Sequence, residues 1–170
     1  MDAAHLACVS LAAAGCVCDL RTRRIPQVLT LGGAAAGIGF HLATGGWTAG
    51  AIGLGGWTVA VLMFLLPFAL GGLGGGDVKL LGALGAWLGP GDAVWLGIYT
   101  GIAGGIIALV WSLANGYLSQ AVRNLYLLFM QWRIGGIRPV PELTLEQGRS
   151  PRLAYAVPIL AGMMVTLWLR

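Results

Sequence analysis

The stretch "GGLGGGDVKLLGALGAWLG" (residues 71–89) decides how this chain is expected to fold. Five of its first six residues are glycine, and an acid and a base, Asp77 and Lys79, then precede a short apolar run. As a helix, the run from Asp77 to Gly89 is only about 20 Å long at 1.5 Å per residue, too short to cross the roughly 30 Å of hydrocarbon in a bilayer. If the chain lies in a membrane, we expect Asp77 below the cytoplasmic surface, because irregular backbone at that depth must line a protein-walled or water-filled cavity.

The composition indicates a membrane protein. Hydrophobic residues make up 58% of the 170 residues and charged residues only 9%, whereas a soluble domain carries roughly a quarter charged residues. The lipid bilayer is therefore an expected partner. The net charge of +4 does not indicate nucleic acid, because the basic residues stand between apolar runs instead of gathering on one face.

Apolar segments predict an all-α, polytopic fold with six transmembrane helices. We expect residues 1–170 to form a single membrane-embedded domain. Residues 115–152 are expected to form a cytoplasmic loop between the fifth and sixth spans. Within this loop, residues 117–132 carry apolar side chains at helical spacing, which predicts an amphipathic helix lying on the membrane surface. The expected spans are residues 3–18, 28–44, 51–70, 77–89, 93–114 and 153–169.

Basic residues fall in alternate connections between these segments. Of the ten, only Arg170 lies on the side of the termini. The positive-inside rule therefore predicts a multi-pass protein with both termini outside the cytoplasm. The nine residues expected in the cytoplasm are Arg21, Arg23, Arg24, Lys79, Arg123, Arg133, Arg138, Arg149 and Arg152.

This topology separates the acidic residues. Asp77 and Asp92 both have the local pattern of a helix N-cap, which accepts hydrogen bonds from free N–H groups. Asp92, however, falls on the outer side, whereas Asp19 closes the first span and Asp77 opens the fourth, both on the cytoplasmic side. Only Asp19 and Asp77 are therefore expected to meet.

Two carboxylates in a partly dry pocket have a specific chemistry. Like charges a few ångströms apart do not both ionise easily, so the pair shares a proton. The ionised member takes a proton from water while the protonated one polarises a carbonyl, as in aspartic proteases. The glycines before Asp77 would let an extended substrate backbone come close. The alternative is purely structural, with Asp77 as an N-cap and Asp19 as the partner of Arg21.

Three segments together resemble the type IV prepilin peptidase family. "CDLRTRRIPQ" (18–27) is similar to the family's first aspartate motif, and "GLGGGDVKLLGALGAWLG" (72–89) to its second, Gly-x-Gly-Asp-x-Lys-Leu. "RLAYAVPILAG" (152–162) is similar to the closing Pro-Tyr-x-x-Ala segment, with alanine in place of the proline. The resemblance extends along the whole chain, including the order of the six spans.

The resemblance implies an aspartic endopeptidase, a hydrolase of the bacterial or archaeal inner membrane that needs no metal or organic cofactor. Its substrates would be prepilins and pseudopilins, which it would cut after their basic leader peptides at the cytoplasmic face. The pilus assembly machinery is a possible further partner. Asp19 and Asp77 would be the catalytic pair. The residues expected to shape the site or bind substrate are Gly74, Gly76, Lys79 and Gln27.

Two departures from the family pattern refine this expectation. Gln27 stands where the family has Asn, and because both are amides we expect an adjusted contact with activity retained. Larger members carry a long cytoplasmic insertion with paired Cys-x-x-Cys motifs and also methylate the new N-terminus. Here only residues 19–27 separate the first two spans, so we expect no methyltransferase activity and a likeness to the short forms that serve tight-adherence pili.

Two readings from other classes stay open. Broken helices, glycine-rich backbone and paired acids also occur in small proton-coupled transporters, although both acids here are expected at one face. A non-catalytic assembly component of a pilus or secretion system would leave both aspartates replaceable by asparagine. Lys79 has two interpretations as well: it binds or tunes the site, or it extends to the interface and fixes orientation.

Overall fold

The computed structural model describes residues 3–116, 118–135 and 154–170, and this part of the chain contains helices and no strand. The all-α prediction is therefore confirmed for these residues. Most of the expected loop after residue 135 lies outside the described residues. The helices are α1 (Ala3–Thr22), α2 (Gln27–Ala69), α3 (Gly75–Leu88), α4 (Pro90–Ala114), α5 (Leu118–Gly135) and α6 (Ala156–Leu169).

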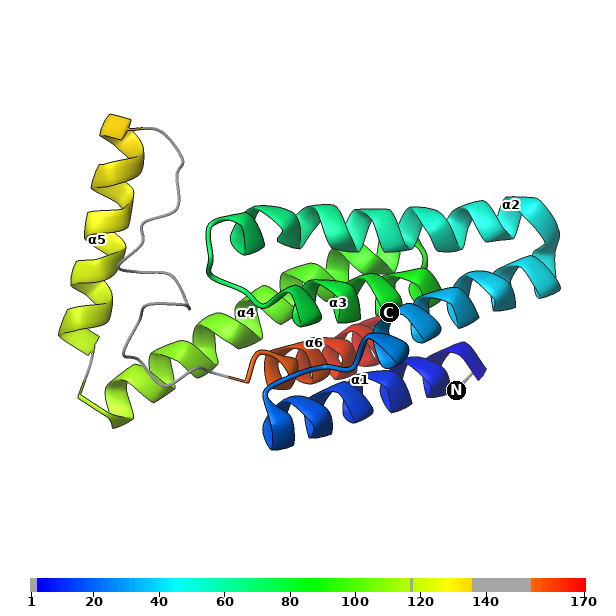
Figure 1. Cartoon of the computed structure of the whole chain (residues 1–170), viewed down its shortest axis with the longest axis horizontal. Helices are drawn as coiled ribbons and strands as arrows, with labels where there is room; N and C mark the ends of the chain where they lie inside the picture. The colour runs from blue at the N-terminus through cyan, green and yellow to red at the C-terminus, as the bar shows by residue number, and fades with distance from the viewer. Residues whose placement is uncertain (1–2, 117, 136–153) are drawn as a thin grey trace.

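Helix α2 is a helical hairpin. Its backbone leaves the helical region at Gly45 and Gly46, where Gly46 has φ 66° and ψ −158°, a conformation that glycine adopts without steric cost. Figure 1 shows the chain reversing at this point, so α2 consists of two antiparallel arms, residues 27–44 and 47–69. The predicted connection at 45–50 is thus reduced to two glycines.

Six apolar helical segments occupy the places where spans were expected: α1, the two arms of α2, α3, α4 and α6. In the described part of the chain, three helices are long and apolar enough to cross a membrane, namely α1, α2 and α4. Helices α3 and α6 have 14 residues each. At 1.5 Å per residue each is only about 20 Å long.

Helix α3 lies at the centre of the bundle. Every residue from Leu80 to Ala86 is buried. The second arm of α2 approaches α3 most closely where Gly56 faces Gly85, because a Cβ on either glycine would overlap the backbone of the other. Many large apolar side chains on the outside of the bundle are exposed, as expected of a surface that faces lipid.

The C-terminal end of α3 is fixed to the first arm of α2 by polar and aromatic contacts. The Trp87 Nε1–H donates to the Gly33 carbonyl at 2.9 Å, and His41 Nε2 donates to the Trp87 carbonyl at 3.1 Å. The rings of Phe40 and Trp87 have centroids 5.4 Å apart. These contacts hold α3 against the first arm of α2, although the second arm of α2 lies between them in the sequence.

Asp92 is not the N-cap of α4, contrary to the sequence pattern. The helix begins one residue after Gly89, and Pro90 takes the first position, so Asp92 lies within the first turn. Its Oδ1 accepts a hydrogen bond from Arg170 Nε at 3.0 Å, and the Arg170 guanidinium lies 5.7 Å from the centroid of the Trp95 ring. Asp92 therefore joins the start of α4 to the end of α6.

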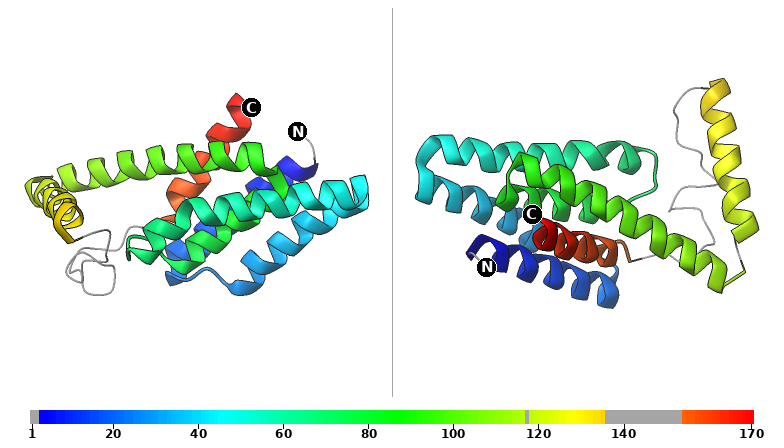
Figure 2. Two further views of the ribbon diagram at one scale, coloured as in Figure 1. Left: turned by 90° about the horizontal axis from the view of Figure 1, so that it is seen from above. Right: turned by 180° about the vertical axis from the view of Figure 1, so that it is seen from behind.

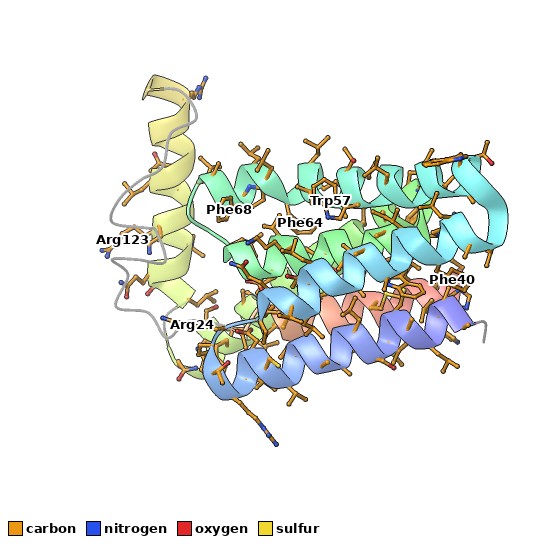
Figure 3. All side chains as sticks on the ribbon, turned by 45° about the vertical axis from the view of Figure 1, so that its right-hand side comes forward. Arg24, Phe40, Trp57, Phe64, Phe68 and Arg123 are labelled. Atoms are coloured by element: carbon orange, nitrogen blue, oxygen red, sulfur yellow. The ribbon has the colours of Figure 1, made fainter. Side chains whose placement is uncertain are left out.

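The two ends of the bundle differ in what they contain. The N-terminus and the α2 reversal lie at one end, while α1 finishes and α3 and α6 begin toward the other (Figure 1). The further views show α5 standing beyond this second end (Figure 2). Arg24, Phe68 and Arg123 are also at the second end, opposite Phe40 (Figure 3). We call it the acid end, because Asp19 and Asp77 lie there.

Candidate active site

Asp19 lies in the last turn of α1 and is buried, with 9% of its surface exposed. The helix continues to Thr22, four residues beyond the predicted end of the first span at residue 18, and Arg23 N–H donates back to the Asp19 carbonyl at 2.9 Å. The side chain is held by another helix: the Ala156 N–H at the start of α6 donates to Asp19 Oδ2 at 3.4 Å. Because the N-terminus of a helix carries partial positive charge, α6 stabilises a carboxylate at this place.

Asp77 is the third residue of α3 and is partly buried. The N-cap of α3 is Gly74, and no side chain caps the helix, so the interpretation of Asp77 as an N-cap is wrong. Its carboxylate instead turns back over the helix start, and Oδ2 lies 2.9 Å from where a Cβ on Gly74 would be. Gly74 thus leaves room for the Asp77 carboxylate itself.

The two acids are close enough to interact electrostatically. The packing of α1 on α3 brings them together: Gly15, one turn before Asp19, receives the side chain of Leu80, one turn after Asp77. A methyl carbon of Leu80 lies 2.7 Å from where a Cβ on Gly15 would be. A larger residue at Gly15 would therefore require the Leu80 side chain to move.

Arg21 does not neutralise Asp19. Its side chain is exposed, and within the described residues it forms no ion pair with the buried carboxylate. The purely structural interpretation of Asp19 as the partner of Arg21 is therefore wrong.

Sequence reasoning noted the segment at the start of α6 as part of the family resemblance but did not place it in the site. Tyr155, the residue before α6, interacts electrostatically with Asp77, and its Oη lies 3.0 Å from where a Cβ on Gly104 of α4 would be. Ala156 contacts Asp19 through its backbone. No sequence signal marks this contact, because a backbone N–H carries no side-chain signature and 137 residues separate Ala156 from Asp19.

The other predicted site residues are Gly76, Gln27 and Lys79. A Cβ on Gly76 would make an ordinary 3.4 Å contact with Ile25. Gln27 is exposed at the start of α2. Lys79 is also exposed, and a residue two positions after Asp77 on a helix faces a different direction. This geometry favours the interfacial interpretation of Lys79 over direct contact with the pair.

Gly74→Ala is expected to impair the site without unfolding the protein. The backbone of Gly74, with φ −78° and ψ 144°, suits alanine, so only the Asp77 carboxylate has to move. A displacement of about 1 Å at a catalytic group lowers the rate by about 100-fold. With Asp77 in the catalytic pair, as the family resemblance implies, we expect a loss of this order in kcat for a leader-peptide substrate, with little change in the thermal unfolding midpoint.

Gly72→Ala is the matched control, because a Cβ there would make an ordinary 3.4 Å contact with the Pro67 carbonyl oxygen. Equal activities for the two variants would show that Gly74 does not position Asp77.

The described chain is an all-helical membrane protein with two acids gathered at one end. It belongs to the type IV leader peptidase family, whose model matches residues 6–109. This range contains both Asp19 and Asp77, and the match confirms the family resemblance. The family makes the protein a protease that acts on prepilin-type substrates in general. No curated protein and no solved structure matches the chain significantly.

Proposed function

We propose that this peptidase is of the aspartic type, with Asp19 and Asp77 as its catalytic pair, and that it cuts basic leader peptides from prepilins and pseudopilins at the cytoplasmic face. The observation that carries the proposal is that two acids from separate helices lie within electrostatic range of each other, both inside the part of the chain that the family model matches.

In the proposed reaction the pair shares one proton. The ionised carboxylate takes a proton from water, whose oxygen adds to the scissile carbonyl carbon while the protonated acid gives its proton to the carbonyl oxygen. The carbon–nitrogen bond then breaks, and a proton passes to the leaving amine. The Ala156 N–H at the start of α6 donates to Asp19 Oδ2, and this hydrogen bond is consistent with Asp19 remaining ionised although it is buried.

The proposed topology has six spans: α1, both arms of α2, α3, α4 and α6. Both termini would then lie outside the cytoplasm, and α5 would lie along the cytoplasmic surface as an amphipathic helix. The position of Arg24 and Arg123 at the acid end supports this orientation (Figure 3).

We further propose that the protein lacks methyltransferase activity and resembles the short forms that serve tight-adherence pili. Only residues 23–26 separate α1 from α2, so this connection has no room for the cytoplasmic insertion of the larger members.

The direct test is cleavage of a prepilin-like polypeptide by the purified protein in lipid vesicles, with both products identified by mass spectrometry. We expect one cut, directly after the basic leader, and slower cutting when the leader's basic residues are replaced by glutamine. Dissipation of a proton gradient by the vesicles without any cleavage would contradict the proposal and favour a transporter.

A further inference from the structure

Among the first three residues of α6, only one backbone N–H is left to reach beyond the helix. Pro158 has no N–H, and the Val157 N–H donates to the Ala154 carbonyl at 3.1 Å. The remaining one, that of Ala156, donates to Asp19 Oδ2 at 3.4 Å. A backbone contact therefore fixes the start of α6 on one member of the acid pair.

Tyr155, the residue before Ala156, is directed to the other member of the pair. Its phenol is partly buried and lies within electrostatic range of Asp77, but it does not form a hydrogen bond with that carboxylate. Among the described residues, the Tyr155 hydroxyl has no hydrogen-bond acceptor at all. Two consecutive residues of the chain thus reach two different acids, and the second contact leaves a hydroxyl proton free for another group.

Gly104 of α4 gives the phenol its position. Gly104 is buried, and Oη, Cε2 and Cζ of Tyr155 lie 3.0, 3.2 and 3.3 Å from where a Cβ on Gly104 would be. The ring therefore packs on bare backbone, and a side chain at Gly104 would displace the hydroxyl. The packing of α4 on α6 holds the hydroxyl beside Asp77 before any substrate arrives.

A free O–H beside the acids suits the charge that develops in peptide hydrolysis. When water adds to the scissile carbonyl carbon, the carbonyl oxygen gains negative charge while the protonated acid gives it a proton. We propose that Tyr155 donates a hydrogen bond to this oxygen and so stabilises the transition state as a preorganised donor. The phenol keeps its proton throughout, so the bonds made and broken are those of the proposed reaction. This inference rests on the proposed function, because it takes a peptide carbonyl at the acid pair to be the reacting group.

Tyr155→Phe is the direct test, because phenylalanine keeps the ring on Gly104 and removes only the O–H. Loss of one such donor lowers kcat by about 100- to 1,000-fold. We expect a loss of this size with a prepilin-like polypeptide in lipid vesicles. KM is expected to stay unchanged, because the hydrogen bond strengthens only in the transition state.

Thr100→Val is the matched control, since it removes another hydroxyl from the same contact between α4 and α6. Thr100 is fully buried one turn before Gly104, and its Oγ1 has no hydrogen-bond partner and packs on Gly162 of α6. We expect wild-type kcat and KM for this variant. Equal kcat values for Tyr155→Phe and Thr100→Val would overturn the inference.

A transition-state analogue separates this role from a structural one. The probe is the same polypeptide with a difluoromethyl ketone at the scissile position, which hydrates to a tetrahedral diol. We expect Tyr155→Phe to weaken binding of this probe by the same factor as it lowers kcat. Its effect on the Kd of the uncut substrate, measured in the Asp77→Asn background, is expected to be negligible. Equal weakening of both ligands would show a structural effect and overturn the inference.

Gly104→Ala tests the positioning of the hydroxyl from the other side of the contact. The new methyl group displaces the phenol, and we expect kcat to fall about tenfold. In the Tyr155→Phe background the same change is expected to have little further effect, because the donor is already absent. Fully additive losses would contradict the coupling of the two residues. Gly105→Ala is the control, because Gly105 is exposed and has open space around it.

Cleavage by Asp77→Asn, measured beside these variants, distinguishes the two ideas. Wild-type cleavage by Tyr155→Phe together with none by Asp77→Asn would overturn the inference and leave the proposed function in place. Undiminished cleavage by Asp77→Asn would contradict the proposed function and the inference with it.

Discussion

Asp19→Asn and Asp77→Asn are each expected to reduce leader-peptide cleavage by about four orders of magnitude or more, the scale seen when one member of a catalytic group is removed. Asparagine keeps the size of the side chain but cannot ionise or share a proton. At position 19 its amide oxygen still accepts the Ala156 N–H, so the contact with α6 is retained. The measurement is kcat/KM on a prepilin-like substrate in lipid vesicles.

Asp92→Asn is the control for this experiment. Asp92 lies at the start of α4 and pairs with Arg170, and both side chains are more than a third exposed. Such an ion pair contributes at most about 1 kcal/mol, so we expect a folded protein with wild-type cleavage. Full activity in a folded Asp19→Asn or Asp77→Asn variant would contradict the catalytic pair.

The second large effect is expected where α2 and α3 approach most closely. In Gly56→Ala and Gly85→Ala the new methyl group would overlap the backbone of the facing helix, so the two helices must separate. Over-packing of a close-packed interior costs about 1–3 kcal/mol, and we expect the upper end of this range because backbone, unlike a side chain, cannot rotate away. The measurement is the thermal unfolding midpoint in detergent.

Gly101→Ala in α4 separates this packing effect from helix propensity. A Cβ at Gly101 has open space around it, and alanine is favoured over glycine in a helix by about 0.5–1 kcal/mol. We therefore expect the control to be as stable as the wild type or slightly more stable. A Gly85→Ala variant with the same midpoint as Gly101→Ala would show that α2 and α3 do not touch as described.

Sequence reasoning located the helices and the two acids because both depend on local patterns. Apolar runs interrupted by glycine and basic residues mark where helices begin and end, and the Asp19 and Asp77 motifs carried the family resemblance that the family model confirms. The alternation of basic residues made only these two acids candidates for a pair, and the structure brings them within electrostatic reach of each other.

Features that depend on tertiary packing were not predictable in the same way. Asp77 and Asp92 share a local N-cap pattern, yet neither caps a helix, because one turns back over Gly74 and the other pairs with Arg170. The contact of Asp19 with Ala156 joins opposite ends of the sequence. A glycine needed for close helix approach, such as Gly56, looks the same in sequence as one that faces open space, such as Gly39.

The shortness of α3 has a consequence for the shape of the enzyme inside the membrane. A helix of 14 residues is about 9 Å shorter than the usual hydrocarbon thickness. Because residues 80–86 of α3 are buried among the other helices, this shortfall lies inside the protein and not against lipid. In the proposed topology, the protein itself would therefore be recessed on the side of the acids, where irregular backbone lines a protein-walled cavity. A peptide bond at the edge of an apolar segment would then reach water and the carboxylates without leaving its own depth in the membrane.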